Sequence, residues 1–577
     1  MKMKFNTIAI VALSLCYAAQ TQAQQDTRKI TFVGAARAQF YSDHYNSYFE
    51  EDTVTTAKLN SGNTLVDLGI NIRPNPQMEI QGMVRVRNDY GGFWGAGVSF
   101  DVRQLYVKGV AGGIVRYQLG DINYKLTPYT LWNSNQEMIT GVPFLLQQQT
   151  NVVNYDHFYA NDNSWRQQGA SAEVGFEFGK LIKEIGIKTV ATRVKTSDFS
   201  QTSDRIFSGV NLSVVQSEHL RVGFNYVNVF DIYGTSRSAT TFHHPVMTAT
   251  MAYRRKMGNW MHSLDAEAGR SKWYYKEQDS DSIPEWQGKF ADAKYKLQHD
   301  AMGISGGVQL KYVSSDFRSM GAQTKRVNYN GQLNAFQRVG NEQALRPVSM
   351  IDLMRESGLY TMQLQTNLMA FNPQYDNITP YGEATPNRQA MILTAGYEKK
   401  SMPVSGQLTY YRGQEVRGEG TTTLRNFERQ EAQVNFNAKN YMAGKDRDAL
   451  VTVRVRNDRT TRQGSESVPA VDLSSKTMTA GIDFEWKKQW HLLAAFQMLA
   501  YEGFELKSVR DEDQQIFNFT ELNLKGSEQL ASIGAKYAFS DKSFLSVQYY
   551  QFLNSTNQLD EALYTNKQWM LLYQINF

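Results

Sequence analysis

The sequence predicts an all-β protein, a single transmembrane antiparallel β-barrel of about 24 strands. Three observations predict it. Many short segments alternate between apolar and polar residues, no apolar run after the N-terminal leader is long enough for a membrane helix, and the last strand is rich in aromatic residues. A chain without membrane helices can satisfy every backbone group in lipid only as a closed barrel.

The N-terminus has the features of a secretory signal peptide. Lys2 and Lys4 make it basic, and residues 7–19 form a short apolar run. Thr21-Gln22-Ala23 then offers small residues at the positions that a signal peptidase reads. The apolar run is too short to span a bilayer as a mature helix. We therefore expect the signal to be cleaved after Ala23.

This cleavage divides the chain into a signal peptide (1–23), a short leader (24–29) and one barrel domain (30–577). The only cysteine, Cys16, lies inside the signal peptide. Leu15 precedes it where a lipoprotein site would need Gly or Ala, so we expect no lipidation. The mature chain then has no cysteine and forms no disulfide, which is ordinary for a bacterial envelope protein.

The composition fits a barrel with a polar interior. Tyr (32), Phe (30) and Gly (42) are plentiful, Pro (12) is scarce, and the mean hydropathy is −0.48. A barrel of this kind has little net hydrophobicity and concentrates its aromatic residues at the two membrane interfaces. Lys and Arg total 61 against 56 Asp and Glu. This near balance argues against a general nucleic-acid binder.

Alternation with a period of two recurs along the whole chain, and in each segment one parity stays polar. One such segment could come from a soluble sandwich, but so many in one chain are typical of a transmembrane barrel. The segments are Met78–Val86, Leu220–Tyr226, Met247–Tyr253, Ile304–Tyr312, Tyr360–Leu368, Ala449–Val455, Met478–Trp486 and Ala531–Phe539.

The connections between these segments alternate in length. Tight links such as Met257–Asn259 and Ser540–Lys542 are separated by long polar stretches such as 43–62. Short periplasmic turns and long extracellular loops are the pattern of barrels. Keeping the two parities consistent from both ends requires one more strand within 314–356, and Arg326–Phe336 is the best candidate. The count is then about 24 strands, within an expected range of about 22–26.

The last strand carries its aromatic and aliphatic residues on one parity: Trp569, Leu571, Tyr573, Ile575 and Phe577. The other parity is mostly polar. The pattern resembles the terminal strand of outer-membrane β-barrel proteins of Gram-negative bacteria. The resemblance implies that these five residues form the signal that the barrel-assembly machinery reads during insertion.

A second resemblance concerns the hairpin formed by Phe100–Gly109 and Ile114–Asp121. It is similar to a hairpin of general and specific porins, in which an Arg-Gln-aromatic-Val strand ends in Gly. The resemblance covers only residues 100–121. Within it, the parity of Asp101 and Arg103 conflicts with that of Leu105, and a β-bulge near Arg103–Gln104 would repair the conflict.

Two short segments share the sequence Val-Arg-Val-Arg-Asn-Asp, at 84–89 and at 453–458. If the valines face lipid, both arginine pairs face the lumen. They could form a basic lining that favours anions, or they could be neutralised by acidic residues of the same lumen. The candidate lumen-lining residues are Arg85, Arg87, Asp101, Arg103, Asp265, Glu267, Arg454, Arg456, Asp483 and Glu485.

The stretch 126–168 is the most irregular part of the chain and carries little charge. Two readings stay open: it folds inward and narrows the lumen, or it caps the barrel rim from outside. His243 and His244 could suggest a metal site, but adjacent strand residues point to opposite faces, and no further ligand lies at suitable spacing. We expect no catalytic site, no metal and no cofactor.

Two functions remain open. The first is a porin-like passive channel for small polar solutes in the outer membrane. The second is a non-conducting structural or partner-binding barrel, a subunit of a secretion or uptake complex or a surface scaffold. A barrel this wide needs material to fill it, because diameter grows with strand number. Expected partners are outer-membrane lipids, the assembly machinery and, for the second function, envelope proteins; nucleic acid is not among them.

Overall fold

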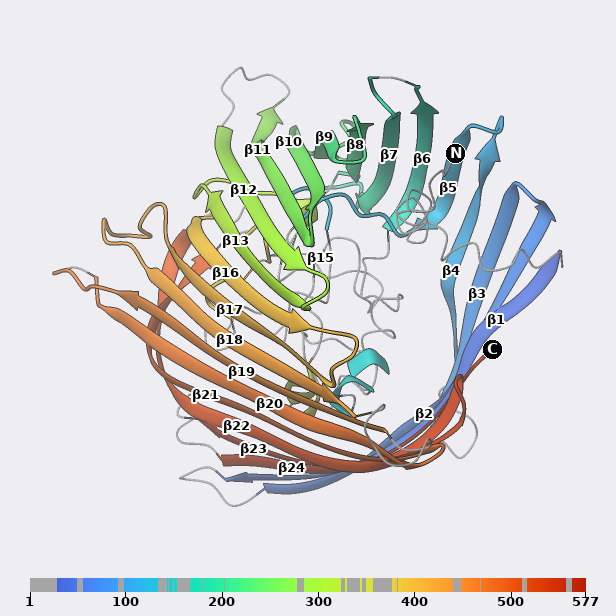
Figure 1. Ribbon diagram of the computed structural model, residues 1–577, viewed down its shortest axis with the longest axis vertical. Coiled ribbons are helices and arrows are strands. Elements are labelled where there is room, and N and C mark those ends of the chain that lie inside the picture. Colours follow the sequence, from blue (N-terminus) through green and yellow to red (C-terminus); the bar gives the residue numbers. More distant parts are fainter. Residues whose placement is uncertain are drawn as a thin grey trace.

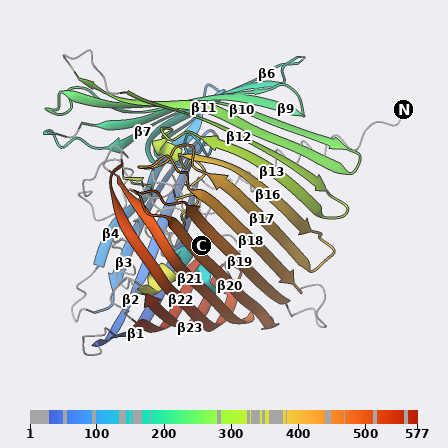
Figure 2. The same ribbon diagram turned by 90° about the vertical axis from the view of Figure 1, so that its left-hand side faces the viewer.

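The protein is a closed antiparallel β-barrel of 22 strands (Figures 1 and 2). The computed structural model describes residues 29–48, 55–91, 98–132, 143, 145–148, 150–152, 167–179, 181–201, 203–277, 285–322, 327–328, 343–344, 349–355, 376–380, 382–438, 448–466, 468–510, 516–556 and 563–577. Within this part of the chain, no helix has the length and apolar character needed to cross a membrane.

Each barrel strand pairs with the next barrel strand along the chain, and β13 pairs with β16. The first thirteen strands are β1 (Ile30–Tyr48), β2 (Thr55–Asn75), β3 (Met78–Asp89), β4 (Val98–Ala111), β5 (Val115–Ile122), β6 (Gln167–Glu177), β7 (Glu184–Lys195), β8 (Arg205–Val215), β9 (Leu220–Asp231), β10 (Thr240–Met257), β11 (Trp260–Glu277), β12 (Glu285–His299) and β13 (Ile304–Val313). The other nine barrel strands are β16 (Arg388–Glu398), β17 (Val404–Gln414), β18 (Asn426–Asn437), β19 (Asp448–Arg462), β20 (Val471–Lys487), β21 (Trp490–Arg510), β22 (Ile516–Ser540), β23 (Ser543–Thr556) and β24 (Leu563–Asn576).

Three short elements lie outside the barrel sheet. β14 (Val327–Asn328) and β15 (Gln343–Ala344) pair only with each other. The 3-10 helix η2 (Met320–Ala322) and the helix α3 (Met350–Arg355) belong to the same long connection between β13 and β16. These elements therefore contribute nothing to the wall of the barrel.

The barrel closes where β1 meets β24. The two strands pair antiparallel from Ala35↔Asn576 to Tyr48↔Leu563. At the rim, the backbone N–H of Gly34 donates to the carbonyl of Phe577 over 3.0 Å, and the N–H of Phe577 donates back over 2.9 Å. An even number of strands allows this fully antiparallel closure. It also places the N-terminal end of β1 and the C-terminal end of β24 at the same rim, which we call the terminal rim.

The two rims differ in their connections. Links at the terminal rim include the residues between β2 and β3 (76–77), between β10 and β11 (258–259) and between β22 and β23 (541–542). The far rim carries the long connections, above all 123–166 and 314–387. The expected long loop 43–62 is wrong, because β1 and β2 extend through it and pair up to Ser47↔Thr55. Tyr, Ser and Thr at these positions suit an extended strand.

The wall has two chemically different faces. On the outer face, large apolar side chains lie exposed on strands all around the barrel, among them Leu68 on β2, Phe224 on β9, Leu408 on β17 and Ile533 on β22. Near the terminal rim, Trp490, Tyr537, Phe539 and Tyr573 form a chain of ring contacts. The opposite parity of the same strands faces the interior, where polar side chains and the connecting segments lie.

The strand count differs from the expected 24 because of one connection. β13 pairs directly with β16 from Ile304↔Tyr397 to Val313↔Arg388, so no barrel strand comes from 314–387. In the candidate strand Arg326–Phe336, Val327 and Asn328 belong to β14, and the other residues lie outside the described residues. The alternating segment Tyr360–Leu368 also lies outside them. The observed 22 strands still fall within the expected range.

The predicted bulge in β4 is confirmed. Met83 pairs with Gln104, but the next residue of β3, Val84, pairs with Val102, so Arg103 is the extra residue of the bulge. The bulge turns the Arg103 side chain to the buried inner face, while Val102 and Leu105 both lie exposed on the outer face. A strictly regular strand could not place Val102 and Leu105 on the same face.

Candidate functional site

The candidate site is the lumen, because five connecting segments fold into it. We call them the inner segments; their described residues fall within 123–132, 143–152, 314–322, 349–355 and 376–387. Figure 1 shows the helical turns of residues 145–148 and 150–152, in teal, inside the ring of strands. All five belong to the two longest connections of the far rim.

Two inner segments pack on the wall around the barrel seam. Leu145, Leu146 and Val152 from one segment, and Met350, Leu353 and Met354 from α3, join a single buried apolar cluster. The wall side of this cluster comes from inner-face residues of β1 and β21–β24, namely Tyr41, Leu493, Ala495, Leu530, Tyr550, Phe552, Met570 and Leu572. Burial of this cluster stabilises the inward position of both segments.

Hydrogen bonds fix the register of these segments on the wall. The Gln548 side-chain amide donates to Oε1 of Gln148 over 2.7 Å, and the Asn566 amide donates to the Met354 carbonyl over 3.3 Å. Pro143 approaches β20 so closely that a Cβ on Gly481 would lie 2.2 Å from its Cβ. A glycine in the wall therefore makes room for the start of the segment.

The segments 123–132 and 314–322 pack on the opposite part of the wall, over β7 to β13. Tyr129, Leu131, Phe317 and Ala322 share a buried apolar cluster with wall residues such as Phe290. The rings of Tyr129 and Phe290 stack at 3.9 Å between centroids. The two segments also bind each other, because the Trp132 N–H donates to the Gly321 carbonyl over 2.8 Å.

Polar contacts also fasten the segment 123–132 to β11 and β12. The Tyr129 hydroxyl donates to Asp292 over 2.6 Å, and the Thr127 hydroxyl donates to Glu267 over 2.7 Å. Burial, and then the negative charge of Asp292, raises the pKa of Tyr129 well above its ordinary value. Tyr129 therefore keeps its proton and stays a donor to Asp292.

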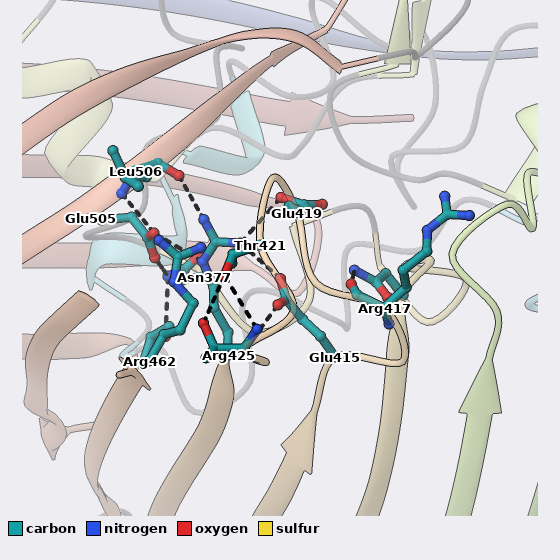
Figure 3. Close-up of polar contacts among 12 residues, drawn as sticks. Asn377, Glu415, Arg417, Glu419, Thr421, Arg425, Arg462, Glu505 and Leu506 are labelled. Atoms are coloured by element: carbon teal, nitrogen blue, oxygen red, sulfur yellow. Dashed lines mark hydrogen bonds and ion pairs between the residues drawn. The ribbon is translucent and has the colours of Figure 1, made fainter. Parts of the chain in front are cut away.

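The segment 376–387 and the β17–β18 connection meet in a buried charged cluster, which Figure 3 shows. Arg425 donates to Glu415 over 2.8 Å, to Glu419 over 3.2 Å and to Glu505 over 3.1 Å. The Asn377 amide donates to Thr460 over 3.1 Å and also to Glu505. Because Glu505 lies on β21, this cluster ties the loop to a strand three places farther along the wall.

A second charged group lies beside it on β18 and β19. Arg429 donates to Asp458 from Nε over 2.8 Å and to Asp376 over 3.2 Å. Arg456 donates to the same Asp458 over 2.9 Å and lies 3.8 Å from Asp376. Two arginines thus share two carboxylates, one on the wall and one on an inner segment. Such charge-assisted bonds are the stronger class of hydrogen bond.

The predicted arginine pairs lie on the inner face, but acids neutralise them. Arg85 forms two bonds of 2.7 Å with Asp67, and the side chains are 1% and 0% exposed. Arg87 donates to Asp89 over 2.8 Å. Arg454 is paired with Glu431 at 2.9 Å, and Arg456 with Asp458. In the structure, acidic side chains therefore neutralise these four arginines, which do not form a free basic lining.

The other predicted residues fall into separate places. Asp101 and Arg103 lie on β4; Glu267 lies under the inner segment 123–132, and Asp265 lies nearer the terminal rim. Asp483 accepts a hydrogen bond of 2.7 Å from His491, and the Glu485 carboxylate accepts one from the Gln489 N–H in the same turn. The structure therefore does not bring the ten residues together into one ring.

The inner wall near the terminal rim stays exposed below the inner segments. Ion pairs there keep much of their surface: Lys188–Glu173 is 47% and 36% exposed, and Arg254–Asp265 is 43% and 50% exposed. Lys294 and Lys296 of β12 are also exposed on this face, and within the described residues neither forms an ion pair. Within the described residues, the inner wall thus carries exposed charged side chains toward the terminal rim and is covered by packed loops toward the far rim.

Sequence reasoning missed the wall residues that receive the inner segments. Tyr550, Phe552, Met570 and Leu572 lie on the parity that should face water in an open pore. Their apolar character was the available signal, because an apolar lumen face needs a covering partner. The acids that neutralise the arginines, Asp67 and Glu431, were also missed. Each lies on the neighbouring strand, and the register between two strands cannot be obtained from a local pattern.

No metal centre is evident in the part of the chain that the structure describes, where no group of three or more His, Cys, Asp or Glu residues lies close enough to hold an ion. His244 points inward and its Nε2 bonds to the Arg318 carbonyl at 3.0 Å. His243 points outward and stacks on Tyr274, with 5.2 Å between the ring centroids. The two histidines therefore cannot share a ligand.

Comparisons with solved structures return outer-membrane barrels. The chain is similar to the P pilus usher (PapC) translocation pore, with 10% identity over 93% of this chain and 99% of that one, and a TM-score of 0.34. It is also similar to Pseudomonas aeruginosa OccK11 (OpdR), with 7% identity, 94% and 96% coverage and a TM-score of 0.36. A third is a loop-deletion mutant of OmpT, an outer membrane protein of Vibrio cholerae, with 9% identity, 95% and 100% coverage and a TM-score of 0.23.

No family model matches the chain, and no curated protein matches it.

Proposed function

We propose that the protein spans the outer membrane and acts as a passive, porin-like channel for small polar solutes, narrowed by its inner segments. The membrane location is supported by the closed sheet, which leaves no unpaired edge, and by the belt of exposed apolar side chains on the outer face. The terminal rim with its short turns would face the periplasm, and the far rim would face outward.

One observation carries the channel reading. Below the inner segments, charged side chains of the inner wall lie exposed, such as Lys188, Arg254, Lys294 and Lys296. A wall surface that is covered by a packed segment would carry apolar side chains instead. Exposed ionic groups on an inner wall are the lining of a water-filled lumen. The inner segments then serve as a constriction, and no catalytic role is part of the proposal.

Single-channel recording of the refolded protein in a planar bilayer tests it. We expect discrete steps in the current. Under a salt gradient, the channel should prefer anions, since Lys294 and Lys296 add positive charge that no described carboxylate balances. The double variant Lys294→Gln/Lys296→Gln should lose that preference. Lys400→Gln, at a turn of the terminal rim, is the matched control and should keep it. An electrically silent barrel would contradict the channel.

The alternative, a non-conducting structural or partner-binding barrel, is favoured by one specific observation. The inner segments pack on the seam through a broad apolar cluster rather than through a few polar contacts. Packing of this kind suits a permanent plug. A silent bilayer, with folding shown by heat-modifiable gel mobility, would support this alternative and direct the search toward envelope protein partners. In either case, insertion would depend on the assembly machinery.

A further inference from the structure

The outer face carries a groove between β10 and β17. Its volume is about 830 Å³. Small residues of β10, β11 and β12 line one part of it, Ala249, Ala266, Ala268, Ala291 and Ala293, and the larger Leu310 of β13 and Met391 of β16 line the adjoining part. The alanines lie in two rows across neighbouring strands, since Ala268 pairs with Ala291 and Ala266 pairs with Ala293. A volume of this size falls in the range of sites that hold a small ligand.

Two cations lie directly above the alanine rows, on the side of the far rim. Arg270 of β11 and Lys289 of β12 are cross-strand partners, and both lie exposed on the outer face. Within the described part of the chain, neither has a carboxylate at ion-pair distance; the nearby Glu285 is paired with Lys272 at 2.5 Å. Like charges directly opposite each other in a sheet are unfavourable. An anion bound between them would relieve this cost.

The height of the two cations on the wall indicates where such an anion would lie. Arg270 and Lys289 are each ten positions from the terminal-rim ends of their strands, Trp260 and His299. A membrane strand needs about 9–11 residues to cross the hydrocarbon core. The pair therefore lies at the outer interface of the bilayer, with the groove within the outer leaflet.

We propose that this groove and the Arg270–Lys289 pair form a binding site for a phosphorylated lipid of the outer leaflet. The phosphate binds between the guanidinium and the ammonium group, and an acyl chain fills the groove over the alanines. Guanidinium groups bind phosphate oxygens through directed, charge-assisted bonds. The site rests on the proposed membrane location, but not on whether the barrel conducts.

Native mass spectrometry of the folded full chain in neutral detergent micelles tests the site. The probes are dimyristoyl phosphatidate, dimyristoyl phosphatidylcholine and inorganic phosphate. Phosphatidate should be retained in preference to phosphatidylcholine, and inorganic phosphate alone should bind far more weakly because it leaves the groove empty. Arg270→Gln/Lys289→Gln should weaken phosphatidate binding roughly 30-fold, at about one kcal/mol for each basic group.

Two further variants keep the test sharp. Arg459→Gln removes an exposed arginine from another part of the wall, where it is paired with Asp472, and should leave binding unchanged. Ala268→Phe fills the groove and should weaken phosphatidate binding while the cations remain. Equal retention by the Arg270→Gln/Lys289→Gln variant, or equal loss by Arg459→Gln, overturns the site. Failure of the proposed membrane location is seen separately, as failure to insert into vesicles.

Discussion

Arg425 donates a hydrogen bond from Nε to the carboxylate of Glu505, 80 positions later in the sequence, over 3.1 Å. Strands β19 and β20 separate the two residues along the wall. The contact is buried, with 5% of the Arg425 side chain and 2% of the Glu505 side chain exposed. This buried pair ties a far-rim loop to a strand three places farther along the wall, and not only to its own two strands.

Replacing Arg425 with Met should release that loop. The change leaves Glu415 and Glu505 as buried charges without their main partner, which costs about 3–5 kcal/mol. Limited proteolysis should then cut the β17–β18 connection faster, and the channel should become noisier. Arg459→Met, which breaks the exposed pair with Asp472, is the control and should change neither. Equal proteolysis of the two variants would show that the buried pair does not restrain the loop.

Introducing a charge at Leu146 should displace an inner segment. Leu146 is fully buried in the cluster at the seam, so Leu146→Asp places a carboxylate where no partner can solvate it. The segment should leave the wall while the barrel stays closed, and single-channel conductance should rise. Gln147→Glu, on the neighbouring and partly exposed position, should leave conductance unchanged. A folded Leu146→Asp barrel with unchanged conductance would mean that this segment does not narrow the lumen.

A pair of adjacent substitutions on β19 tests the assignment of faces. Val455 is 47% exposed on the outer face, whereas Arg454 points inward and is paired with Glu431. Val455→Arg should cost about 2–4 kcal/mol near the bilayer midplane. Arg454→Gln keeps a hydrogen-bond donor for Glu431 on the inner face and should therefore destabilise the barrel less than Val455→Arg does. Denaturant unfolding in bilayers measures both, and equal tolerance would contradict the assignment.

Gly34 leaves room for the closure of the barrel. A Cβ at this position would lie 2.0 Å from the Asp67 carbonyl oxygen and 3.0 Å from the Phe577 ring. Gly34→Val should therefore push β1 away from its neighbours and abolish the compact, heat-modifiable band on gels. Ala36→Val, two positions along the same face, should keep that band. A compact Gly34→Val barrel would show that the seam tolerates a side chain there.

Low pH should loosen the β7–β8 connection (196–204) before it affects the barrel. Burial alone would raise the pKa of Asp204, but hydrogen bonds from Arg193 and from the Ser197 N–H lower it below its ordinary value. A carboxyl whose folded pKa is lowered stabilises the fold above its unfolded pKa and loses that contribution as the pH falls through the folded pKa. The pair is largely exposed, so the effect is about 0–1 kcal/mol.

Hydrogen exchange of the amides in 196–204 should accordingly speed up below about pH 4. Asp204→Asn should show the faster exchange already at neutral pH. If acid leaves these amides as protected as before, the Asp204 carboxylate does not hold this connection in place.

The sequence predicted the strands of the barrel wall well and the packing of the inner segments poorly, and particular residues show why. Alternation is a local property, so segments such as Leu220–Tyr226 and the parity break at Arg103 could be assigned without neighbours. Whether an alternating segment joins the sheet depends on the pairing of distant strands, which is why the expected strand within 314–356 was wrong. The inner segments needed long-range information too, since Leu145 and Met350 meet only on a wall formed by both chain ends.

The seam between β1 and β24 also sets the order of assembly. Asn566 bonds to Asp43, 523 positions earlier, so this pairing is among the most non-local contacts of the molecule. Such contacts form late, because the long loop between them must first be closed. A chain that stops short of β24 would keep both of its outermost strands unpaired, ready to aggregate with any other edge. We therefore expect the pairing of β24 with β1 to be the late step that ends the risk of aggregation during folding.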